Sequence, residues 1–523
     1  MGLSEFRSSG SDAEAARPAP AVIRPSLTAN LIANVAGKAW ASLLGLLFVP
    51  VYVRLMGIES YGLVGIYVSL TALLSVLDLG LSPTLSRELA RLGVAADARA
   101  RADERDLVRT FEAVFWAVGL CLGVLWALLS PVVAHHWVGA TRLAGGTVER
   151  AFLLMGVLVA VQWPSSVYDG GLTGLERQIR LNAIRISMGT IQSAGAAVVL
   201  WLVAPSILVY VGWQALCALA QTLLLRHALW GALPGDERAE FRRELLARHA
   251  RFAAGMTGIS VLAIVLTQTD KVILSRLLPL ETFGYYVLAS SVASVLTFLV
   301  APAFAALFPR FTQLFASGAD EASIASLYHG AAQAVATLSL PAAGVLVAFG
   351  DELLLIWTRD PVIVTHSAPF MRLLAIGSGL NAVMVVPYLL QVSYGWTRLA
   401  VVKNVVAVTI LVPLLVWGVQ RYGAICGPIA WVALNAGYVL VEVPVMHRRL
   451  LSRERWAWYR RDLALPVATV AAVAGLSRLL APRGAAPLAT FAWIAVTGLV
   501  ALAACAAVMP ATRAWLEGQV RRT

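Results

Sequence analysis

Six charged side chains stand inside long apolar stretches of the sequence, where a charge has few partners. They are Lys38, Lys271 and Lys403, the only lysines of the chain, and the acids Asp78, Asp270 and Glu442. An ionised group within an apolar span is costly and is expected to face a water-filled cavity or a partner of opposite charge. The lysines suit a partner of negative charge, because opposite charges attract strongly where the dielectric is low. The acids suit either the binding of an ion or internal salt bridges.

The three lysines differ in their depth within the apolar stretches. Lys38 lies about ten residues into its stretch, which at about 1.5 Å per residue is roughly 15 Å deep. Lys403 lies about seven residues into its stretch, where a lysine side chain can also extend to the interface. Lys271 directly follows Asp270 in the chain. Two interpretations therefore stay open, a site for an anion or a set of intramembrane salt bridges.

The amino-acid composition indicates whether these charges lie in a soluble protein or in a membrane protein. Of the 523 residues 59% are hydrophobic and only 13% are charged, with a mean hydropathy of +0.76, whereas soluble domains carry about 25% charged residues. This excludes an ordinary soluble enzyme. The net charge of +12 does not indicate nucleic-acid binding, because arginines placed between apolar runs are what the positive-inside rule predicts for a membrane protein.

The histidines and cysteines do not form a pattern that is typical of a metal site, a disulfide or a catalytic site. His135 and His136 are adjacent near the end of a span and have no third ligand nearby in sequence, so no metal site is expected. The four cysteines lie in apolar runs and suggest neither disulfides nor a zinc site: Cys121, Cys217, Cys426 and Cys505. No catalytic residue and no cofactor is predicted.

Runs of about 20 apolar residues, long enough to cross roughly 30 Å of hydrocarbon, are the elements that must position the charges. Fourteen such spans are expected, near 28–53, 61–83, 110–136, 150–170, 181–203, 206–226, 252–276, 282–308, 323–350, 367–393, 397–420, 423–446, 463–480 and 487–509. No cleavable signal peptide is expected, because the first apolar run is too long and contains Lys38. The fold class predicted is an all-α polytopic membrane protein.

The arginines predict how the spans are oriented. With the N-terminus inside, the cytoplasmic segments hold 29 arginines and the opposite side holds 9, and basic residues near span ends set topology. The dense inner segments are 87–109, 226–251 and 448–461. Both termini are therefore expected in the cytoplasm.

The sequence also repeats itself at an offset near 222 residues. Arg54, Leu55, Glu59, Tyr61 and Gly62 recur as Arg276, Leu277, Glu281, Phe283 and Gly284, and further on Gly174, Arg177 and Asn182 recur as Gly395, Arg398 and Asn404. An even number of spans separates the two copies, so both copies have the same orientation. Spans 1 to 6 and 7 to 12 are thus expected to form two parallel six-helix bundles, related by a pseudo-two-fold axis along the membrane normal, with a cleft between them.

This organisation predicts seven segments. They are a disordered cytoplasmic tail at 1–27, an N-terminal six-helix lobe at 28–226, a cytoplasmic linker at 227–251, a C-terminal six-helix lobe at 252–446, a basic cytoplasmic loop at 447–462, two further membrane helices at 463–509 and a cytoplasmic tail at 510–523.

Several stretches resemble the bacterial polysaccharide flippases of the Wzx type. The resemblance is carried by Leu55 to Gly62, Asp78 to Leu81, Ser86 to Glu88, Gly171 to Gln178, Asp270 with Lys271, and Gly284 to Tyr286. The superfamily of these flippases also contains the multidrug and toxin extruders (MATE) and the lipid II flippases. The resemblance implies translocation of an undecaprenyl-pyrophosphate-linked oligosaccharide across the inner membrane, with membrane lipids, a polysaccharide polymerase and export machinery as further partners. It also implies a cationic central cavity, onto which Lys38 maps best, ahead of Lys271 and Lys403. The resemblance further implies alternating access that is driven by the substrate or coupled to an ion, either H⁺ or Na⁺, for which Asp78, Asp270 and Glu442 are the candidate residues.

Two alternatives stay open at this point. A MATE-like drug or ion antiporter would favour acids in its cleft, because its cargo is cationic. A polytopic enzyme of glycan assembly, such as a polymerase, ligase or glycosyltransferase, usually carries reactive groups on sizeable loops. The longest outer segments here, near 137–149 and 351–366, are short, and no loop carries an Asp-x-Asp pair. A transporter without enzymatic activity is therefore the prediction.

Overall fold

The structure, a computed structural model, describes residues 27–78, 80–93, 98–235, 238–482 and 484–513, and within its helices the side chains of 27–32, 35, 38, 98–100 and 247–263 fall outside the description. Every regular element of the described residues is a helix, as predicted. Twelve described segments are long and apolar enough to cross a membrane. Helices suit this environment because lipid offers no partner for a backbone N–H or C=O group. The chain is therefore a multi-pass membrane protein, while the number of fourteen spans stays a prediction.

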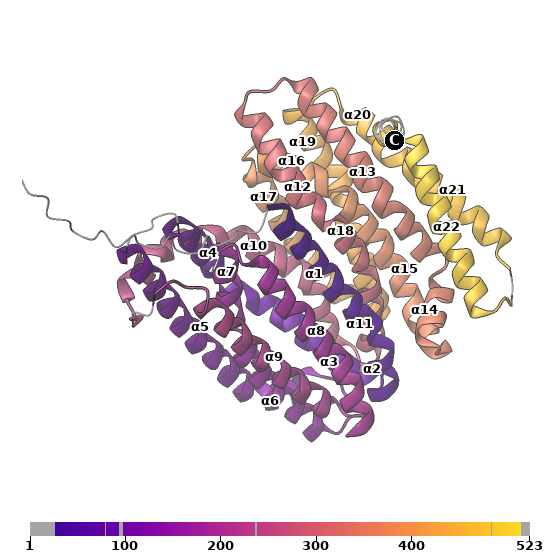
Figure 1. Ribbon diagram of the computed structural model, residues 1–523. Coiled ribbons are helices and arrows are strands. Elements are labelled where there is room, and N and C mark those ends of the chain that lie inside the picture. Colours follow the sequence, from indigo (N-terminus) through magenta and orange to yellow (C-terminus); the bar gives the residue numbers. More distant parts are fainter. Residues whose placement is uncertain (1–26, 79, 94–97, 236–237, 483, 514–523) are drawn as a thin grey trace, which may run out of the picture.

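The first half of the chain forms one bundle, coloured indigo to magenta in Figure 1. Its elements are α1 (Leu27–Leu47), α2 (Val49–Met56), α3 (Ile58–Leu74), η1 (Ser75–Asp78), α4 (Leu81–Leu92), α5 (Ala98–Val132), η2 (Val133–Trp137), α6 (Gly145–Gln162), α7 (Ser165–Gly174), α8 (Gln178–Leu202) and α9 (Ile207–Trp230). Within it α1 packs on α8, and α6 packs on both α5 and α9.

The second half continues with a matching series. Its elements are α10 (Arg243–Leu277), α11 (Leu280–Ala293), α12 (Val295–Ala316), α13 (Glu321–Ala348), α14 (Gly350–Thr358), α15 (Pro361–Val383), α16 (Val385–Ser393), α17 (Thr397–Tyr422), η3 (Gly423–Ile425), α18 (Cys426–Gly437), η4 (Tyr438–Glu442) and α19 (Val443–Leu450). α10 packs on α17, as α1 packs on α8 in the first half, and it also contacts α3, α4 and α5. The helix that opens the second half therefore links the two bundles.

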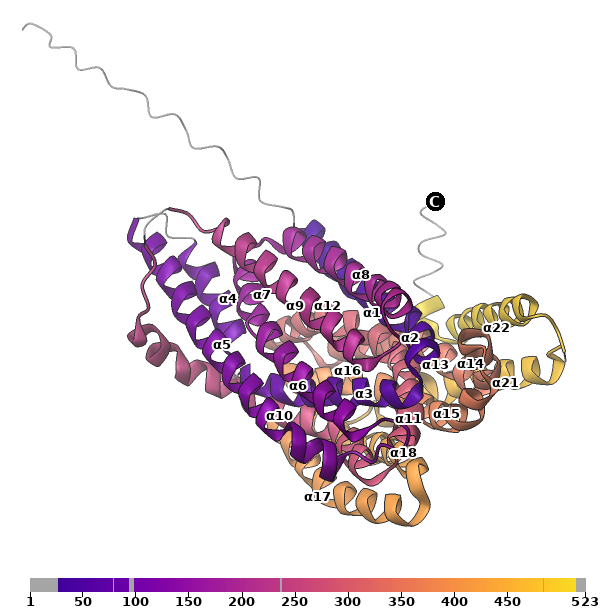
Figure 2. The same cartoon turned by 90° about the horizontal axis from the view of Figure 1, so that it is seen from below.

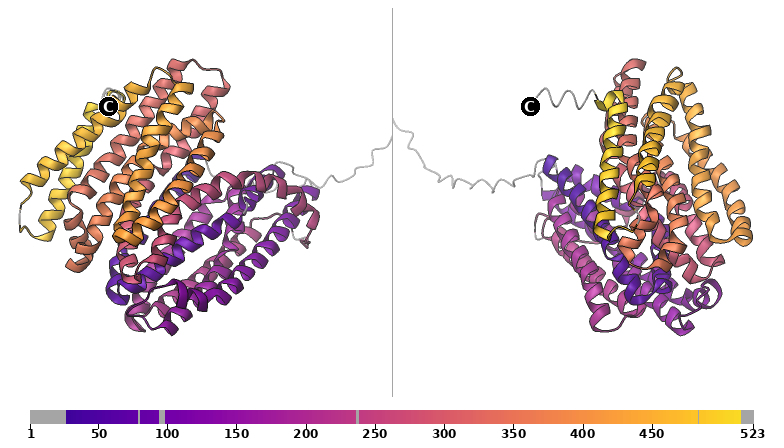
Figure 3. Two further views of the ribbon diagram at one scale, coloured as in Figure 1. Left: turned by 180° about the vertical axis from the view of Figure 1, so that it is seen from behind. Right: turned by 90° about the vertical axis from the view of Figure 1, so that its right-hand side faces the viewer.

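A last pair of membrane helices lies at one edge of the second bundle, in yellow in Figures 1 and 3. The chain reaches it through α20 (Arg455–Ala457) and η5 (Trp458–Ala464), and the pair itself is α21 (Leu465–Leu480) and α22 (Pro487–Val508). His329 of α13 connects the segment before this pair to the bundle, because its imidazole lies between Asp462 of η5 and Glu454, the latter at 3.1 Å.

Asp320 caps the start of α13, and hydrogen bonds from Ser323 lower the pKa of the Asp320 carboxyl.

Several helices continue past the apolar runs that predicted them. α5 begins at Ala98, although its apolar run begins near 110, and α10 begins at Arg243 although its run begins near 252. Arginine, glutamate and alanine are good helix formers. An apolar run therefore shows which part of a helix contacts lipid, but it does not show where the helix begins or ends. The basic segments predicted as loops therefore consist largely of helix ends, and the loop between α9 and α10 is shorter than the linker expected at 227–251.

Breaks in the membrane helices follow the sequence repeat. α6 and α7 meet at Trp163 and Pro164, and α15 and α16 meet at Met384, about one repeat length further along the chain. Pro164 explains the first break, because a proline inside a helix removes a backbone donor. Discontinuous membrane helices are a common place for binding sites in transporters.

The two bundles form a V, which Figure 1 shows from the side and Figure 2 shows from below. They converge where α2, α3 and α11 lie and diverge toward α4 and α19. At the convergent end α3 packs directly on α11. A Cβ atom on Gly62 would lie 2.7 Å from the backbone oxygen of Leu280, and one on Gly284 would collide with the backbone oxygen of Ile58. Glycine at these two positions allows the helix backbones to touch.

Candidate functional site

Lys403 and Glu442 form a close ion pair inside the second bundle. The Lys403 Nζ atom lies 2.6 Å from each carboxylate oxygen of Glu442, and both side chains are buried. The Gln391 amide also donates a hydrogen bond to the same carboxylate, at 2.7 Å. The rings of Tyr388 and Tyr438 lie 5.2 and 4.3 Å from the ammonium, within cation–π range. Of the two interpretations of the buried lysines, the contacts of Lys403 agree with an internal salt bridge.

Lys271 is held much more loosely. Its ammonium donates to the Thr267 carbonyl at 3.2 Å and lies 3.9 Å from the nearer oxygen of Asp270, with a quarter of its side chain exposed. Asp270 itself accepts a hydrogen bond from the Tyr286 hydroxyl. The positive charge of Lys271 is therefore less completely compensated than that of Lys403.

One carboxylate oxygen of Asp270, the Oδ1 atom, is buried and accepts no hydrogen bond from the described residues. Asp270 borders a small cavity of about 40 Å³ between α10, α17 and α18. This is enough space for a single water or a small ion, since a water needs roughly 10–15 Å³ by this measure. A buried carboxylate oxygen beside such a cavity is chemically suited to a proton or a metal cation.

The structure gives fewer contacts for Asp78, and none for the side chain of Lys38. Asp78 ends the 3₁₀ turn η1 between α3 and α4, and it accepts a hydrogen bond from the Ser82 hydroxyl at 2.9 Å. The side chain of Lys38 lies outside the described residues, although its backbone belongs to α1. The structure thus brings together Lys403 with Glu442, and Lys271 with Asp270.

Several asparagine side chains within the spans join helices. Asn34 accepts from Asn182 at 2.6 Å, Asn381 donates to Asn435 at 2.9 Å, and Asn404 accepts from Tyr438 at 3.0 Å. His135 lies 3.6 Å from Glu149, and the described residues contain no cluster of three groups that could hold a metal ion.

The repeat revealed the residues of the convergent end but not the segment that joins them. Glu59 is buried and accepts hydrogen bonds from the backbone nitrogens of Arg142 and Leu143 at 2.9 and 3.0 Å. The Arg142 side chain pairs with Glu281 at 2.9 Å. Nearby, Leu280 donates to the Gly139 carbonyl at 2.9 Å. The stretch 137–143, here called the strap, therefore ties α3 to the second bundle, and no motif in it predicted this role.

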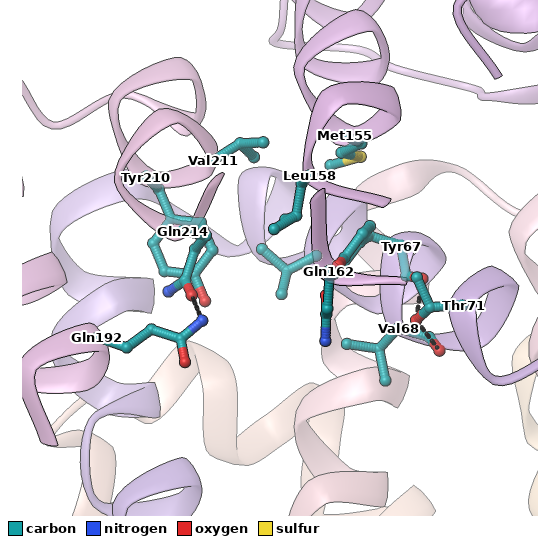
Figure 4. A pocket seen from close by; sticks show the side chains of 11 residues that line it. Tyr67, Val68, Thr71, Met155, Leu158, Gln162, Gln192, Tyr210, Val211 and Gln214 are labelled. Carbon is teal, nitrogen blue, oxygen red and sulfur yellow. Dashed lines mark hydrogen bonds between the residues drawn. The ribbon is translucent and has the colours of Figure 1, made fainter. Parts of the chain in front are cut away.

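A second feature that sequence reasoning missed is a polar pocket within the first bundle (Figure 4). It has a volume of about 260 Å³ and lies between α3, α6, α8 and α9. In the sequence, Gln162 and Gln192 are polar residues within apolar spans. Tyr67 and Gln214, which bond to them, come from other helices. Only the fold could bring these four residues together.

Comparison with known proteins agrees with this architecture. Residues 27–315 match the family described as polysaccharide biosynthesis protein. The succinoglycan biosynthesis transport protein ExoT of Rhizobium meliloti (strain 1021) is 23% identical over 451 residues, which are 85% of this chain and 82% of that protein.

Two solved structures share the fold at low sequence identity. The lipid II flippase MurJ, in an inward closed conformation, has a TM-score of 0.68 at 9% identity, and the match covers 92% of this chain and 98% of that one. A multidrug resistance MATE family transporter, in an inward-facing conformation, has a TM-score of 0.66 at 14% identity, covering 79% and 95%. These similarities confirm the predicted MATE-like helical fold. Because the family match extends over more than half of the chain, this protein belongs to the polysaccharide biosynthesis protein family.

Proposed function

We propose that this protein is a flippase that moves an undecaprenyl-pyrophosphate-linked oligosaccharide, an O-antigen, capsule or exopolysaccharide unit, across the bacterial inner membrane. The family match, the transport protein of succinoglycan biosynthesis among its relatives and the lipid II flippase among its structural neighbours support this proposal. These proteins are named for transport, in agreement with the expectation that the chain is not an enzyme.

The observation that carries the choice of an anionic cargo is the state of Lys271. Its ammonium has a carboxylate only at 3.9 Å, and part of its side chain is exposed. A pyrophosphate is a better partner for such a charge than a cationic drug, because opposite charges attract strongly where the dielectric is low. Lys271 and Lys38 are therefore the proposed diphosphate-binding residues. Lys403 is a weaker candidate for the diphosphate site, because its ammonium is already paired with the Glu442 carboxylate.

The V-shaped arrangement supports a mechanism of alternating access. The strap and the contact of Gly62 and Gly284 close one end, while the bundles diverge at the other. In the orientation that the arginines favour, both termini and the divergent end face the cytoplasm, and the cargo enters there. Release on the other side then requires the strap and the α3–α11 contact to separate.

Coupling of this cycle to an ion would fall to Asp270. Its buried Oδ1 atom accepts no hydrogen bond from the described residues, lies 3.9 Å from the Lys271 ammonium and adjoins a cavity that suits a proton or Na⁺. Glu442 is paired with its lysine at 2.6 Å, and neither Glu442 nor Asp78 borders this cavity, so these two acids are weaker candidates. The partners proposed on this basis are the lipid-linked glycan, the membrane lipids, and a polymerase with its export machinery.

The experiment that tests the function reconstitutes the full-length protein in liposomes that contain the lipid-linked glycan of its own host. An impermeant reagent reports the leaflet in which the glycan lies, and mass spectrometry reports its mass. A flippase changes the leaflet distribution and leaves the mass unchanged. A folded and energised preparation that moves no glycolipid would contradict the proposal. A product of new mass would establish the enzyme alternative, and export of a cationic dye without glycolipid movement would establish the drug antiporter.

A further inference from the structure

The pocket of the first bundle is built from uncharged polar groups. Its polar lining is made of two tyrosines, three glutamines and a threonine, which are Tyr67, Tyr210, Gln162, Gln192, Gln214 and Thr71. The rest of the lining is apolar. Figure 4 shows the glutamine side chains pointing into the space between the helices. A few placed polar groups in an otherwise apolar cavity are typical of a binding site for a small molecule.

The absence of charge from this lining restricts what the pocket can hold. None of the described residues that border it is ionic. A buried cation or a diphosphate would lose its hydration without gaining a counter-charge, which is unfavourable. A neutral molecule with many hydroxyl groups meets no such cost, because amide and hydroxyl groups can replace the water that it loses.

The side chains keep hydrogen-bonding capacity for such a molecule. Tyr67 donates to the Gln162 carbonyl oxygen at 2.7 Å, and the Gln192 amide nitrogen bonds to the Gln214 carbonyl oxygen. A glutamine side chain offers two donors and two acceptor positions. Each of these bonds occupies only one of them, and it also holds the amide in a fixed orientation. The pocket is thus a preorganised set of donors and acceptors around two aromatic rings.

We propose that this pocket binds one uncharged sugar ring of the glycan, at a position separate from the diphosphate. The volume of about 260 Å³ lies just below the roughly 300–1,000 Å³ of pockets that enclose drug-sized ligands, so it accommodates a single ring and not a whole oligosaccharide. Val68, which borders the pocket, is 55% exposed, so the pocket is not sealed. This inference rests on the proposed flippase function.

The position of the pocket fits a glycolipid that bridges two sites. α3 supplies Tyr67 and Thr71 to the pocket and packs on α10, the helix that carries Lys271. Gln162 is the last residue of α6, directly before the break at Trp163 and Pro164. A cargo whose diphosphate lies beside α10 can therefore place its first sugars against the adjacent helix and the break.

The test measures binding to the full-length protein in lipid nanodiscs by calorimetry. The two probes are the water-soluble oligosaccharide released by mild acid from the host's own glycolipid, and inorganic pyrophosphate. Tyr67→Phe deletes one oxygen atom from the pocket, and Gln162→Leu removes an amide. Gln221→Leu on α9 is the matched control, because Gln221 does not border the pocket.

We expect each pocket variant to weaken oligosaccharide binding about three- to tenfold, as the loss of a hydrogen bond predicts, with pyrophosphate binding unchanged and Gln221→Leu like the wild type. The inference would be overturned if the wild type bound no oligosaccharide, or if both pocket variants bound it as tightly as the wild type. The liposome assay keeps the two proposals apart. If wild-type protein moves the glycolipid while the pocket variants bind sugar normally, only the sugar site is wrong. If wild-type protein moves no glycolipid, the flippase function itself is wrong.

Discussion

Gly62 and Gly284 occupy equivalent positions in the two halves of the chain, and each lies against the other half's helix. Gly62 abuts the backbone oxygen of Leu280, and Gly284 abuts the backbone oxygen of Ile58. Each pair of contacting residues is the other pair shifted by one repeat of about 222 residues. The pseudo-two-fold axis therefore passes between α3 and α11. This reciprocal contact brings the backbones of the two halves together, and it must separate if the convergent end opens.

The first prediction concerns Gly62→Ala. The added Cβ atom would lie 2.7 Å from the Leu280 oxygen, so the helices must move apart, and such overpacking costs about 1–3 kcal/mol. We expect a shift of the population toward the conformation that is open at this end. Increased labelling of a thiol placed at Ser60, which is buried on α3 at this end, would report the shift. Gly45→Ala is the matched control, because a Cβ there meets no atom within 4 Å, and equal labelling of the two variants would contradict the prediction.

The second prediction compares Glu59 with its repeat partner Glu281. Glu59 is buried and accepts backbone hydrogen bonds from the strap, whereas Glu281 pairs with Arg142, whose side chain is 73% exposed. Glu59→Gln leaves buried donors poorly satisfied, which costs about 1–3 kcal/mol. Glu281→Gln removes an exposed ion pair worth at most about 1 kcal/mol. Glu59→Gln should therefore lower the apparent melting temperature more. An equal or larger loss for Glu281→Gln in the same detergent would show that the strap is held by its arginine instead.

The contrast between these two glutamates shows what the sequence can predict. The repeat aligned Glu59 with Glu281 and Gly62 with Gly284, so the equivalence of α3 and α11 could be predicted, whereas their direct contact could not. The repeat could not show that Arg142 joins the two halves, because the strap has no counterpart in the pattern. Charge partners behave similarly, since Lys403 and Glu442 are recognisable as buried charges but become a pair only when α17 packs beside η4.

Helix packing also decides which predicted polar residues form a site. The spans and the apolar periodicity determine where helices cross the membrane, but a pocket needs the rotation of each helix about its axis. Gln162 and Gln192 were visible as polar residues in apolar runs, whereas their convergence with Tyr67 and Gln214 depends on four helices. Nothing in a single sequence reports that rotation when the helices are apolar on nearly every side.

The third prediction tests whether Lys403 is structural. Removing one partner of a buried ion pair leaves an uncompensated charge and typically costs about 3–5 kcal/mol. Lys403→Met and Glu442→Gln should therefore each reduce the amount of folded protein. The double variant Lys403→Met with Glu442→Gln should recover both folded protein and glycolipid transport. Recovery of folding without transport would instead place Lys403 in the substrate site.

The fourth prediction concerns topology. In a chain whose four cysteines are replaced, a thiol at Arg101 should be protected from an impermeant maleimide in intact cells, because 29 of the arginines lie on the side assigned to the cytoplasm. A thiol at Ala144, next to the strap, should react. Permeabilising the cells should expose Arg101→Cys and provides the control. Labelling of Arg101→Cys in intact cells would reverse the orientation and the proposed direction of transport.

The last prediction addresses the diphosphate directly through Lys271. Lys271→Ala removes a charge that has no close carboxylate, so its loss leaves no strongly paired acid behind, in contrast to Lys403→Met. We expect normal abundance in the membrane and at least a tenfold loss of glycolipid transport, the effect of about 1.4 kcal/mol of lost interaction. Lys271→Arg should retain part of the activity, since the charge remains while the geometry changes. Lys38→Ala should behave like Lys271→Ala. Asp270→Asn is the informative companion, because a coupling residue should leave pyrophosphate binding intact and abolish only the dependence of transport on the ion gradient. Normal glycolipid transport by Lys271→Ala and Lys38→Ala at wild-type abundance would remove both lysines from the substrate site.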